Sequence, residues 1–364
     1  MGVLSANPET GICSKDFIPS KTTNLNDVSE YKTYILDEKE IDIWDDFVSR
    51  SPHGTIFHRL DWLRAAEKHS ANRFIPVAVK KGGHIVCLLP LFMKKKYRVK
   101  VLLSPPDSCG IPHLGPVFNI PATNRFNHEN TYLDITDSYI RFIEKKIGFD
   151  YFRIIHVPDI VDMRPYAWNG YKIRPSYTYR FNLTAGPGKI YQEFHSTTKN
   201  SLNKTGNNGT ISVSREWKYA TIILALVEKR YNEQNRVFNI GKRYFHDLVS
   251  SSLNENIEPV AVLYNGSIIA GDISLVDRKN AYAWLGTVNR PVDIRGGGEL
   301  VLWENVKDYS QRGLKTYDFI GANTRHICKH KSKYGADLVM YFEIFKTSSL
   351  GSLALKVFKL YEKQ

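Results

Sequence analysis

The residues with the clearest capacity for chemistry form a run of four, which is Arg295, Gly296, Gly297 and Gly298. Glycines at a helix N-terminus let backbone N–H groups approach an anion, and the helix dipole favours negative charge at that end. The spacing fits neither the Walker lysine loop nor the dinucleotide pattern G-x-G-x-x-G with its later acidic residue. The run therefore predicts either a phosphate-binding turn of another type or a backbone corner that holds no ligand.

The segments around this run have the patterns of an α/β unit. Residues 281–287 are aromatic and β-prone, which predicts a strand. Glu299 opens a predicted helix with apolar residues at helical spacing, and Gly313 ends it. Thr316–Ile320 has the pattern of a short buried strand. The glycine run thus lies where a strand is followed by a helix, and that context favours a functional turn.

A second candidate group is Asp318, which stands between Tyr317 and Phe319 in that predicted strand. A buried carboxylate needs a partner, and burial raises its pKa toward the range of a general base. A structural hydrogen bond at the end of the strand explains the same residue, so both interpretations stay open at this point.

The chain contains a weak internal repeat. Pro-Val-Ala-Val occurs at 76–79 and at 259–262, and each copy is followed at the same spacing by a glycine and an isoleucine. Each copy predicts a β-hairpin, and Asn265-Gly266 is a strong signal for a type I′ turn. Helical patterns precede both hairpins. The repeat predicts a duplicated α/β unit.

Further elements are predicted on either side of a boundary near Tyr171–Thr178. A strand is expected at 151–157 and another at 176–183, and Ile190–Lys204 is expected to be one helix. Residues 350–364 have the pattern of a basic amphipathic helix. Such a helix more commonly packs onto a domain, and we expect at most peripheral contact with a membrane.

Composition sets the outer bounds of these predictions. The chain has 364 residues, which suggests two domains, and it is 42% hydrophobic and 24% charged, as globular proteins are. A net charge of +13 and a pI near 9.3 suit an anionic partner, such as phosphates, a nucleotide-linked substrate, tRNA or a membrane surface. Generic solubility explains the charge as well.

The cysteines and apolar segments indicate a cytosolic protein. The four cysteines have no Cys-x-x-Cys spacing, which favours a reducing compartment. The histidines show no metal-ligand spacing, so we predict no metal site. No apolar run is long enough to span a bilayer, and residues 1–30 lack the apolar core of a secretory signal and are expected to form a flexible tail.

Several segments, in sequence order, resemble the Fem family of aminoacyl transferases, which build peptidoglycan cross-bridges, and their wider double-GNAT relatives. The resemblance extends from about residue 44 to the C-terminus, and six motifs in one order are together more specific than any one alone. The segments are Thr55–His58 with Trp62, Ser176–Leu183, Phe194–Lys204, Arg295–Gly313, Tyr317–Gly321 and His330–Ala336.

The resemblance implies an α/β fold of mixed sheets with two tandem GNAT-like domains, the C-terminal helix returning to the first. The first domain is expected at 31–175 plus 345–364, and the second, the acyltransferase domain, at 176–344. It also implies transfer of an acyl or aminoacyl group from acyl-CoA or aminoacyl-tRNA, as cosubstrate, to an amine. No tightly bound cofactor is expected.

The resemblance also places candidate catalytic residues. Lys331 occupies the lysine position of the family's Phe-Lys-x-x-Phe-Gly motif, where it is a candidate for positive charge near the transferring carbonyl, and Asp318 is the second catalytic candidate. The alternative is that Lys329, Lys331 and Lys333 form one solvated edge. Arg295 and Gly296–Gly298 are the candidates for donor binding.

Candidate acceptor contacts carry a positive charge or an aromatic ring. Cations would make charge-assisted contacts with phosphates, and aromatic rings would line a cleft. A solvated helix face or a packed core explains the same residues. The sequence departs from the family's pattern where Lys199 replaces Arg, Thr205 replaces Ala and His330 replaces Phe, which leaves the substrate open. The candidates are Lys199, Lys204, Arg236, Tyr282 and Tyr334.

Two classes of function follow. The first is an acyl or aminoacyl transferase that acts on an amine of a cell-envelope precursor or a similar acceptor with phosphate groups, with tRNA as a partner only if it is the donor. The second is a catalytically inactive double-GNAT module that binds a phosphorylated or polyanionic partner. Exposure of Lys331 and Asp318 together in an open channel favours the enzyme, and burial of both in structural contacts favours the binding module. We expect a monomer.

Overall fold

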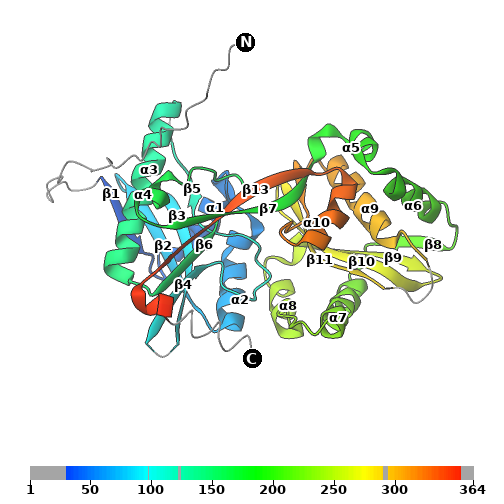
Figure 1. Cartoon of the computed structure of the whole chain (residues 1–364), viewed down its shortest axis with the longest axis horizontal. Helices are drawn as coiled ribbons and strands as arrows, with labels where there is room; N and C mark the ends of the chain where they lie inside the picture. Colours follow the sequence, from blue (N-terminus) through cyan, green and yellow to red (C-terminus); the bar gives the residue numbers. More distant parts are fainter. Residues whose placement is uncertain (1–29, 97, 122–123, 290–293, 354–364) are drawn as a thin grey trace, which may run out of the picture. The chain divides into compact units, whose positions relative to one another are not determined.

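A mixed sheet forms the framework of the protein (Figure 1). The structure is a computed structural model, and it describes residues 30–96, 98–121, 124–289 and 294–353. The strands are β1 (Tyr31–Ile35), β2 (Arg73–Lys81), β3 (His84–Lys96), β4 (Val99–Ser104), β5 (Val117–Phe118), β6 (Tyr151–Ile155), β7 (Lys172–Asn182), β8 (Ile211–Ser214), β9 (Ile257–Tyr264), β10 (Ser267–Val276), β11 (Asn280–Val288), β12 (Thr316–Asp318) and β13 (Asp337–Thr347). Within the described residues these 13 strands have the order β1-β2-β3-β4-β6-β13-β7-β12-β11-β10-β9-β8, with β5 paired to β3 beside this path. The pairs β4–β6 and β11–β12 are parallel.

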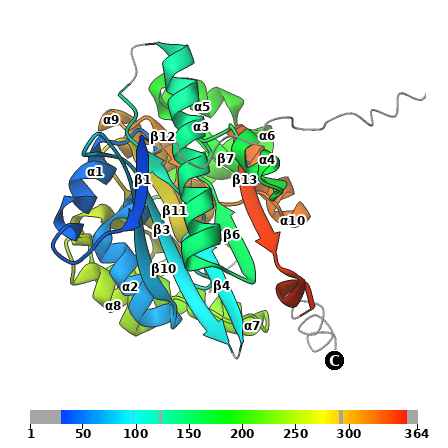
Figure 2. The ribbon, with the colours of Figure 1, turned by 90° about the vertical axis from the view of Figure 1, so that its left-hand side faces the viewer.

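Helices cover both faces of the sheet. They are α1 (Trp44–Arg50), α2 (Leu60–Ser70), α3 (Arg125–Phe142), α4 (Arg164–Trp168), α5 (Pro187–Glu193), α6 (Ser196–Gly206), α7 (Lys218–Glu233), α8 (Lys242–Val249), α9 (Gly297–Gln311) and α10 (Arg325–Lys331). Successive side chains of a strand point to opposite faces. Val260 and Val262 of β9 therefore pack with α9, whereas Ala261 and Leu263 pack with α7. In the N-terminal half α3 packs over β1 and β2 (Figure 2).

Two long strands, β7 and β13, join the halves of the sheet. The first nine residues of β13 pair with β7, and its last five pair with β6, so the chain returns to the N-terminal half as a strand. The predicted boundary at Tyr171–Thr178 lies in β7 rather than in a linker. Each half has a buried cluster of its own beside one shared cluster. The division into 31–175 plus 345–364 and 176–344 stays a prediction.

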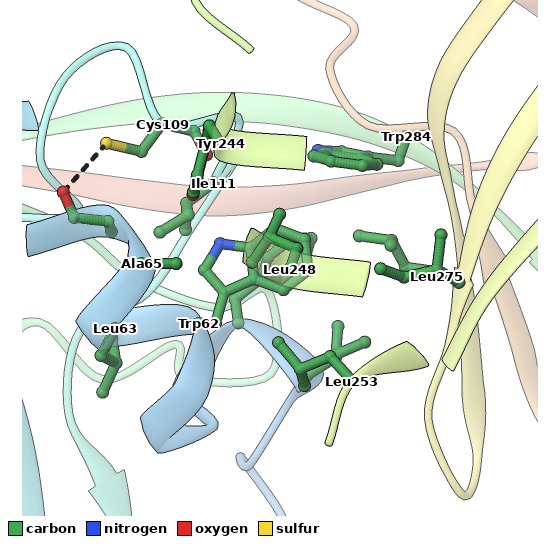
Figure 3. Close-up of a cluster of buried hydrophobic side chains, with 14 of the residues drawn as sticks. Trp62, Leu63, Ala65, Cys109, Ile111, Tyr244, Leu248, Leu253, Leu275 and Trp284 are labelled. Carbon is green, nitrogen blue, oxygen red and sulfur yellow. Dashed lines mark hydrogen bonds between the residues drawn. The ribbon is translucent and has the colours of Figure 1, made fainter. Parts of the chain in front are cut away.

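The shared cluster contains a seam of aromatic side chains from distant parts of the chain. Trp62 of α2 and Trp284 of β11 meet edge to face with 5.3 Å between ring centroids, and Trp284 stacks on Phe245 of α8 at 6.3 Å. The indole Nε1 of Trp284 donates to Gly110 O at 2.9 Å. Tyr244 packs in the same cluster (Figure 3). The seam fixes α8 and β11 against the N-terminal half.

The two predicted hairpins are confirmed as β2–β3 and β9–β10, each with a helical element before it. The turn of the second has positive φ at both central residues, 47° at Asn265 and 78° at Gly266, as a type I′ turn requires. No helix of the described residues has the length and apolar character needed to cross a bilayer.

Two predicted elements differ from the structure, and two predicted segments lie partly or wholly beyond the described residues. The single helix expected at Ile190–Lys204 is wrong, because the backbone is extended at Phe194, which is buried, and His195 caps the separate helix α6. The strand expected at Thr316–Ile320 ends at Asp318. Residues 354–364 of the predicted C-terminal helix and residues 1–29 of the predicted tail lie outside the described residues.

Candidate functional site

The glycine run lies at the start of α9, where Gly296 caps the helix and Gly297 and Gly298 are its first residues. Gly296 has a φ of 95°, and a Cβ on it would lie 2.1 Å from Thr205 Oγ1. Thr205 Oγ1 in turn donates to Arg295 O at 2.7 Å, so α6 is held close against the turn. A Cβ on Gly297 would meet Ala270 at 3.0 Å. Gly298 is helical without positive φ, so the conformation that demands glycine is at Gly296.

A cavity of about 370 Å³ lies at this turn, and we call it the turn cavity. The four predicted donor-binding residues all line it. Lys333 and Tyr334 join them, together with Thr197 and Ser201 of α6. The structure thus brings Arg295 and Gly296–Gly298 together with the N-terminal ends of two helices, in an arrangement that suits phosphate groups.

A larger cavity of about 570 Å³ lies between α7, β10, β11, α9 and α10, and we call it the central cavity. It adjoins the turn cavity, because Gly298, His330 and Tyr334 line both. Lys331 and Arg236 also line it. The structure therefore places predicted residues of each class around one space: the donor residue Gly298, the catalytic residue Lys331, and the acceptor residues Arg236 and Tyr334.

Sequence reasoning missed the carboxylate that lines this central cavity, Asp272 of β10. Its side chain accepts hydrogen bonds from Ser274 Oγ, from Asn305 Nδ2 at 3.4 Å and from Tyr317 Oη at 3.4 Å. Burial raises the pKa of Asp272 to about 7, although these hydrogen bonds favour the charged form. A carboxyl group with this pKa is suited to exchange protons near neutral pH.

A sequence signal for Asp272 does exist. Asp272 is the one charged residue in the strand sequence SIIAGDISLV, and every residue of this strand after Ser267 is buried. Charged residues are rarely fully buried without a partner or a function. The same strand carries a bulge between Ile273 and Ser274 in its pairing with β11. Bulges recur next to active sites because they redirect side chains.

Lys331 lies at the end of α10, and its ammonium group is fully engaged. Nζ donates to three backbone oxygens, those of Phe319 at 2.6 Å, Ile320 at 2.9 Å and Gly321 at 2.8 Å. Burial lowers the pKa of Lys331 to about 8. The alternative of one solvated lysine edge is wrong for this residue, because Lys331 is turned inward whereas Lys329 and Lys333 are exposed.

Asp318 is fully buried and holds a network rather than facing the central cavity. Its Oδ1 accepts from Thr178 Oγ1 at 2.6 Å and from Ile320 N at 2.8 Å, and its Oδ2 lies 3.4 Å from Arg180 Nε. Neither Asp318 nor Lys331 offers a free polar group to a substrate in this arrangement. By the criterion stated above, the structural contacts of this pair favour the binding module, whereas Asp272 supplies a carboxyl group at the cavity.

The predicted acceptor residues do not all come together. Tyr282 is buried in the core, where its ring contacts Phe57 at 5.2 Å. Lys199 Nζ donates to Gln192 O, and Lys204 is exposed on α6; among the described residues, none of these three lines the central or the turn cavity. Their roles stay predictions.

A third space, the proline-loop cavity of about 380 Å³, lies beyond the central cavity. It is lined by the loop of residues 105–112, by Arg153 and by the segment 237–240. Tyr231, Trp284 and Ile320 line both the central and the proline-loop cavity, so the two spaces share a wall.

Comparison with known proteins agrees with this geometry. Residues 194–331 match the family model of the acetyltransferase (GNAT) domain. This stretch contains the glycine turn, Asp272, Asp318 and Lys331. The match identifies an acyltransferase domain and confirms the predicted class of enzyme. None of the curated proteins matches the chain in sequence.

Solved structures resemble the chain over most of its length. FemX has a TM-score of 0.65 at 12% identity, with 89% of this chain and 99% of that chain covered. The C-terminal domain of a putative lysylphosphatidylglycerol synthetase from Agrobacterium fabrum has 0.53 at 13%, covering 87% and 95%. L-PGS from Bacillus licheniformis has 0.52 at 12%, covering 88% and 96%. These likenesses confirm the predicted fold, a double-GNAT architecture of the FemX type.

Proposed function

We propose that this acyltransferase moves an acyl group from an activated donor to an amine, with Asp272 as the general base. The observation that carries the proposal is a buried carboxyl group with a pKa of about 7 in the cavity that adjoins the glycine turn. An amine must lose a proton to attack a carbonyl, and a base whose pKa is near the operating pH does this best.

The donor we propose is an acyl-CoA. Its phosphates would lie in the turn cavity against Arg295 and the N-terminal end of α9, and its thioester would reach the central cavity near Gly298. Aminoacyl-tRNA also has phosphates and an activated carbonyl, and the likeness to FemX keeps it as the second donor to test.

The reaction is an addition followed by an elimination. The amine nitrogen attacks the thioester carbon, a C–N bond forms, and the carbonyl oxygen becomes an oxyanion. Asp272 takes the proton that the amine loses. The C–S bond then breaks, the oxyanion returns to a carbonyl, and the thiolate leaves and takes up a proton from the medium. The products are an amide and free CoA.

The acceptor we propose is an amine of a cell-envelope precursor or a similar molecule with phosphate groups. The net charge of +13 and the two arginines that line the central cavity, Arg230 and Arg236, suit an anionic acceptor. The likeness to FemX supports the same class. The competing function is a binding module without turnover, which the structural contacts of Asp318 and Lys331 favour.

The test is a matched screen of donors. Acyl-CoAs and aminoacyl-tRNAs are each mixed with amine acceptors, and amide formation is followed by mass spectrometry for the wild type, for Asp272→Asn and for Glu304→Gln, a charge change on the α9 surface. Amide formation that Asp272→Asn abolishes and Glu304→Gln retains supports the proposal. Tight binding of a polyanion without turnover by the wild type would support the binding module instead.

A further inference from the structure

The turn after β12 has a strained backbone that only specific contacts can maintain. Ile320 has a φ of 50° and Gly321 a φ of 82°, both in the left-handed region. Glycine adopts that region freely, whereas a β-branched residue such as isoleucine rarely does. A strained non-glycine residue persists where its surroundings determine it, and such residues cluster at functional sites. The contacts around Ile320 must therefore hold this turn in its strained conformation.

Contacts hold this turn from two sides. On one side the ammonium group of Lys331 uses all three of its donors on the consecutive carbonyls of residues 319–321. On the other side Asp318 accepts from Ile320 N at 2.8 Å, and Thr178 Oγ1 accepts from Gly321 N at 3.2 Å. Lys331 is thus the clamp that gathers three carbonyl dipoles which would otherwise repel one another.

The clamped residue occupies a particular place. Ile320 lines both the central cavity and the proline-loop cavity, with Tyr231 and Trp284 as the other shared residues. Trp284 is fixed by its hydrogen bond to Gly110 O at 2.9 Å. The ring of Tyr231 packs against Phe238 with 5.2 Å between centroids. The strained turn therefore supplies one of three residues that separate the two spaces.

We propose that Lys331 is a positioning residue that holds Ile320 as part of the wall between the two cavities, and that this wall selects acceptor amines by their size. The inference rests on the proposed function, since it takes the central cavity as the place of acyl transfer. An acceptor that enters through the proline-loop cavity must pass between Ile320, Trp284 and Tyr231 to reach the acyl carbon. Lys331 then acts on the acceptor through Ile320 and does not touch the reacting atoms.

The charge of Lys331 depends on the groups that surround it. Asp318 and Cys328 favour the ammonium form, while burial opposes it and lowers the pKa of Lys331 to about 8. His330 precedes Lys331 on α10, and Arg180 pairs with Asp318. A neutral amine has two N–H donors instead of three, so the clamp weakens as pH rises through about 8.

The test compares Lys331→Met with Lys329→Met, an exposed lysine of the same helix. Acceptor amines of increasing size are assayed at fixed donor concentration. For Lys331→Met we expect the preference between the largest and smallest acceptor to change by about tenfold or more, on the scale of a pocket contact, with the change in the acceptor KM. Lys329→Met should match the wild type. Lys331→Arg, which keeps the charge, should restore part of the preference.

The opposite pattern would overturn the proposal. A lysine that stabilises the transition state directly would, on removal, lower kcat by about 10²–10³ for every acceptor alike. Ile320→Gly gives a second route, because it removes both the strain and the side chain at the wall. It should change acceptor preference in the same direction as Lys331→Met, and an unchanged preference would contradict the proposal.

Hydrogen exchange separates failure of this inference from failure of the proposed function. In Lys331→Met the amides of Ile320 and Gly321 should exchange faster than in the wild type, and those of β11 should not. This result requires no substrate. Unchanged exchange at the turn would refute the clamp, whereas faster exchange in a protein that transfers no acyl group would leave the clamp in place and refute the proposed reaction.

Discussion

The two hairpins of the repeat carry different residues at one buried position that they share, and that difference separates the halves of the molecule. In the β2–β3 hairpin Val77 pairs with Leu89, and in the β9–β10 hairpin the corresponding Val260 pairs with Asp272. Leu89 and Asp272 are both almost fully buried. The same backbone position therefore contributes an apolar contact in one half and a carboxyl group at a cavity in the other.

The environment of each position matches its residue. Leu89 lies in the apolar cluster of the N-terminal half, and Leu91 follows it on the same face. Asp272 is followed at that spacing by Ser274, which donates to it. A duplicated unit can thus keep its strand pairing while one copy replaces two leucines with a polar pair. The carboxyl group that we propose as the general base lies in the copy with the polar pair.

Removal of the carboxyl group should have the largest effect of any change at these two positions. Asp272→Asn keeps the shape and most hydrogen bonds but cannot take up a proton at neutral pH. We expect the transfer rate to fall by about 10²–10⁴, which is what general bases contribute. The wild-type rate should rise with pH through about 7, and the variant should lack this rise. A steady-state pH profile measures both.

Replacing a residue at the corresponding site of the other hairpin is the control. Leu89→Met changes the shape of a buried side chain and little else, and such swaps usually cost less than about 1.5 kcal/mol. The variant should keep the wild-type rate and pH profile. Equal losses of activity in Leu89→Met and Asp272→Asn would mean that both positions serve only the fold.

Buried titratable groups in the two halves should change the stability of the fold in opposite directions as pH rises. The folded-state pKa of Asp272 is about 7 against 3.8 without burial, so the folded state holds a proton more tightly, and Asp272 lowers stability as pH rises from about 4 to 7. Complete loss of this proton costs as much as ~4 kcal/mol. Thermal melts at pH 4.5 and 7.5 should show Asp272→Asn gaining stability relative to the wild type at the higher pH.

Buried histidines in the N-terminal half have the reverse effect. Burial lowers the pKa of His58 and of His156 to about 3 and that of His113 to about 4, against 6.5 without burial. The folded state therefore binds fewer protons, and stability is lost as pH falls below about 6.5. His156→Leu should move the acid unfolding midpoint to lower pH. An unchanged midpoint would exclude His156 as a cause of acid unfolding.

The loss of stability on replacing a glycine should also differ between the turn of the β2–β3 hairpin and the turn before α9. Gly296→Ala places a Cβ 2.1 Å from Thr205 Oγ1 at a φ of 95°, and strain of this kind costs about 1–3 kcal/mol or more. Gly82→Ala also has positive φ, but nothing lies within 4 Å of its Cβ, so it should cost less. Chemical denaturation of both variants measures the difference. Similar losses would show that crowding by α6 is unimportant.

The smallest expected effect is at Thr205, whose hydroxyl ties α6 to the α9 turn. Thr205→Ala removes one hydrogen bond and should cost about 0.5–1.5 kcal/mol, with a weaker affinity for acyl-CoA as the accompanying change. Thr210→Ala, which removes an exposed hydroxyl bonded to Asn208, is the matched control. If donor affinity falls equally in both variants, the turn is not the donor site.

The fold was largely predictable from sequence because its signals are local. The type I′ turn at Asn265-Gly266 and the helix after the glycine run follow from residue types within a few positions. The site was less predictable. Asp318 was predicted from its place in a buried strand and Lys331 from its motif position, but their partners, Thr178 and the carbonyls after β12, come from other strands and from backbone geometry. Asp272 was missed because a lone acid in an apolar strand gains meaning only when a cavity lies beside it.

The return of β13 has a consequence for biosynthesis. β6 pairs with β4 on one side and with residues 343–347 on the other, so its second edge stays open until residues 343–347 leave the ribosome. An unpaired strand edge is a template for association with other chains. The N-terminal half, although translated first, therefore completes its sheet only when β13 is made, and a nascent chain stalled before residue 337 should aggregate through β6.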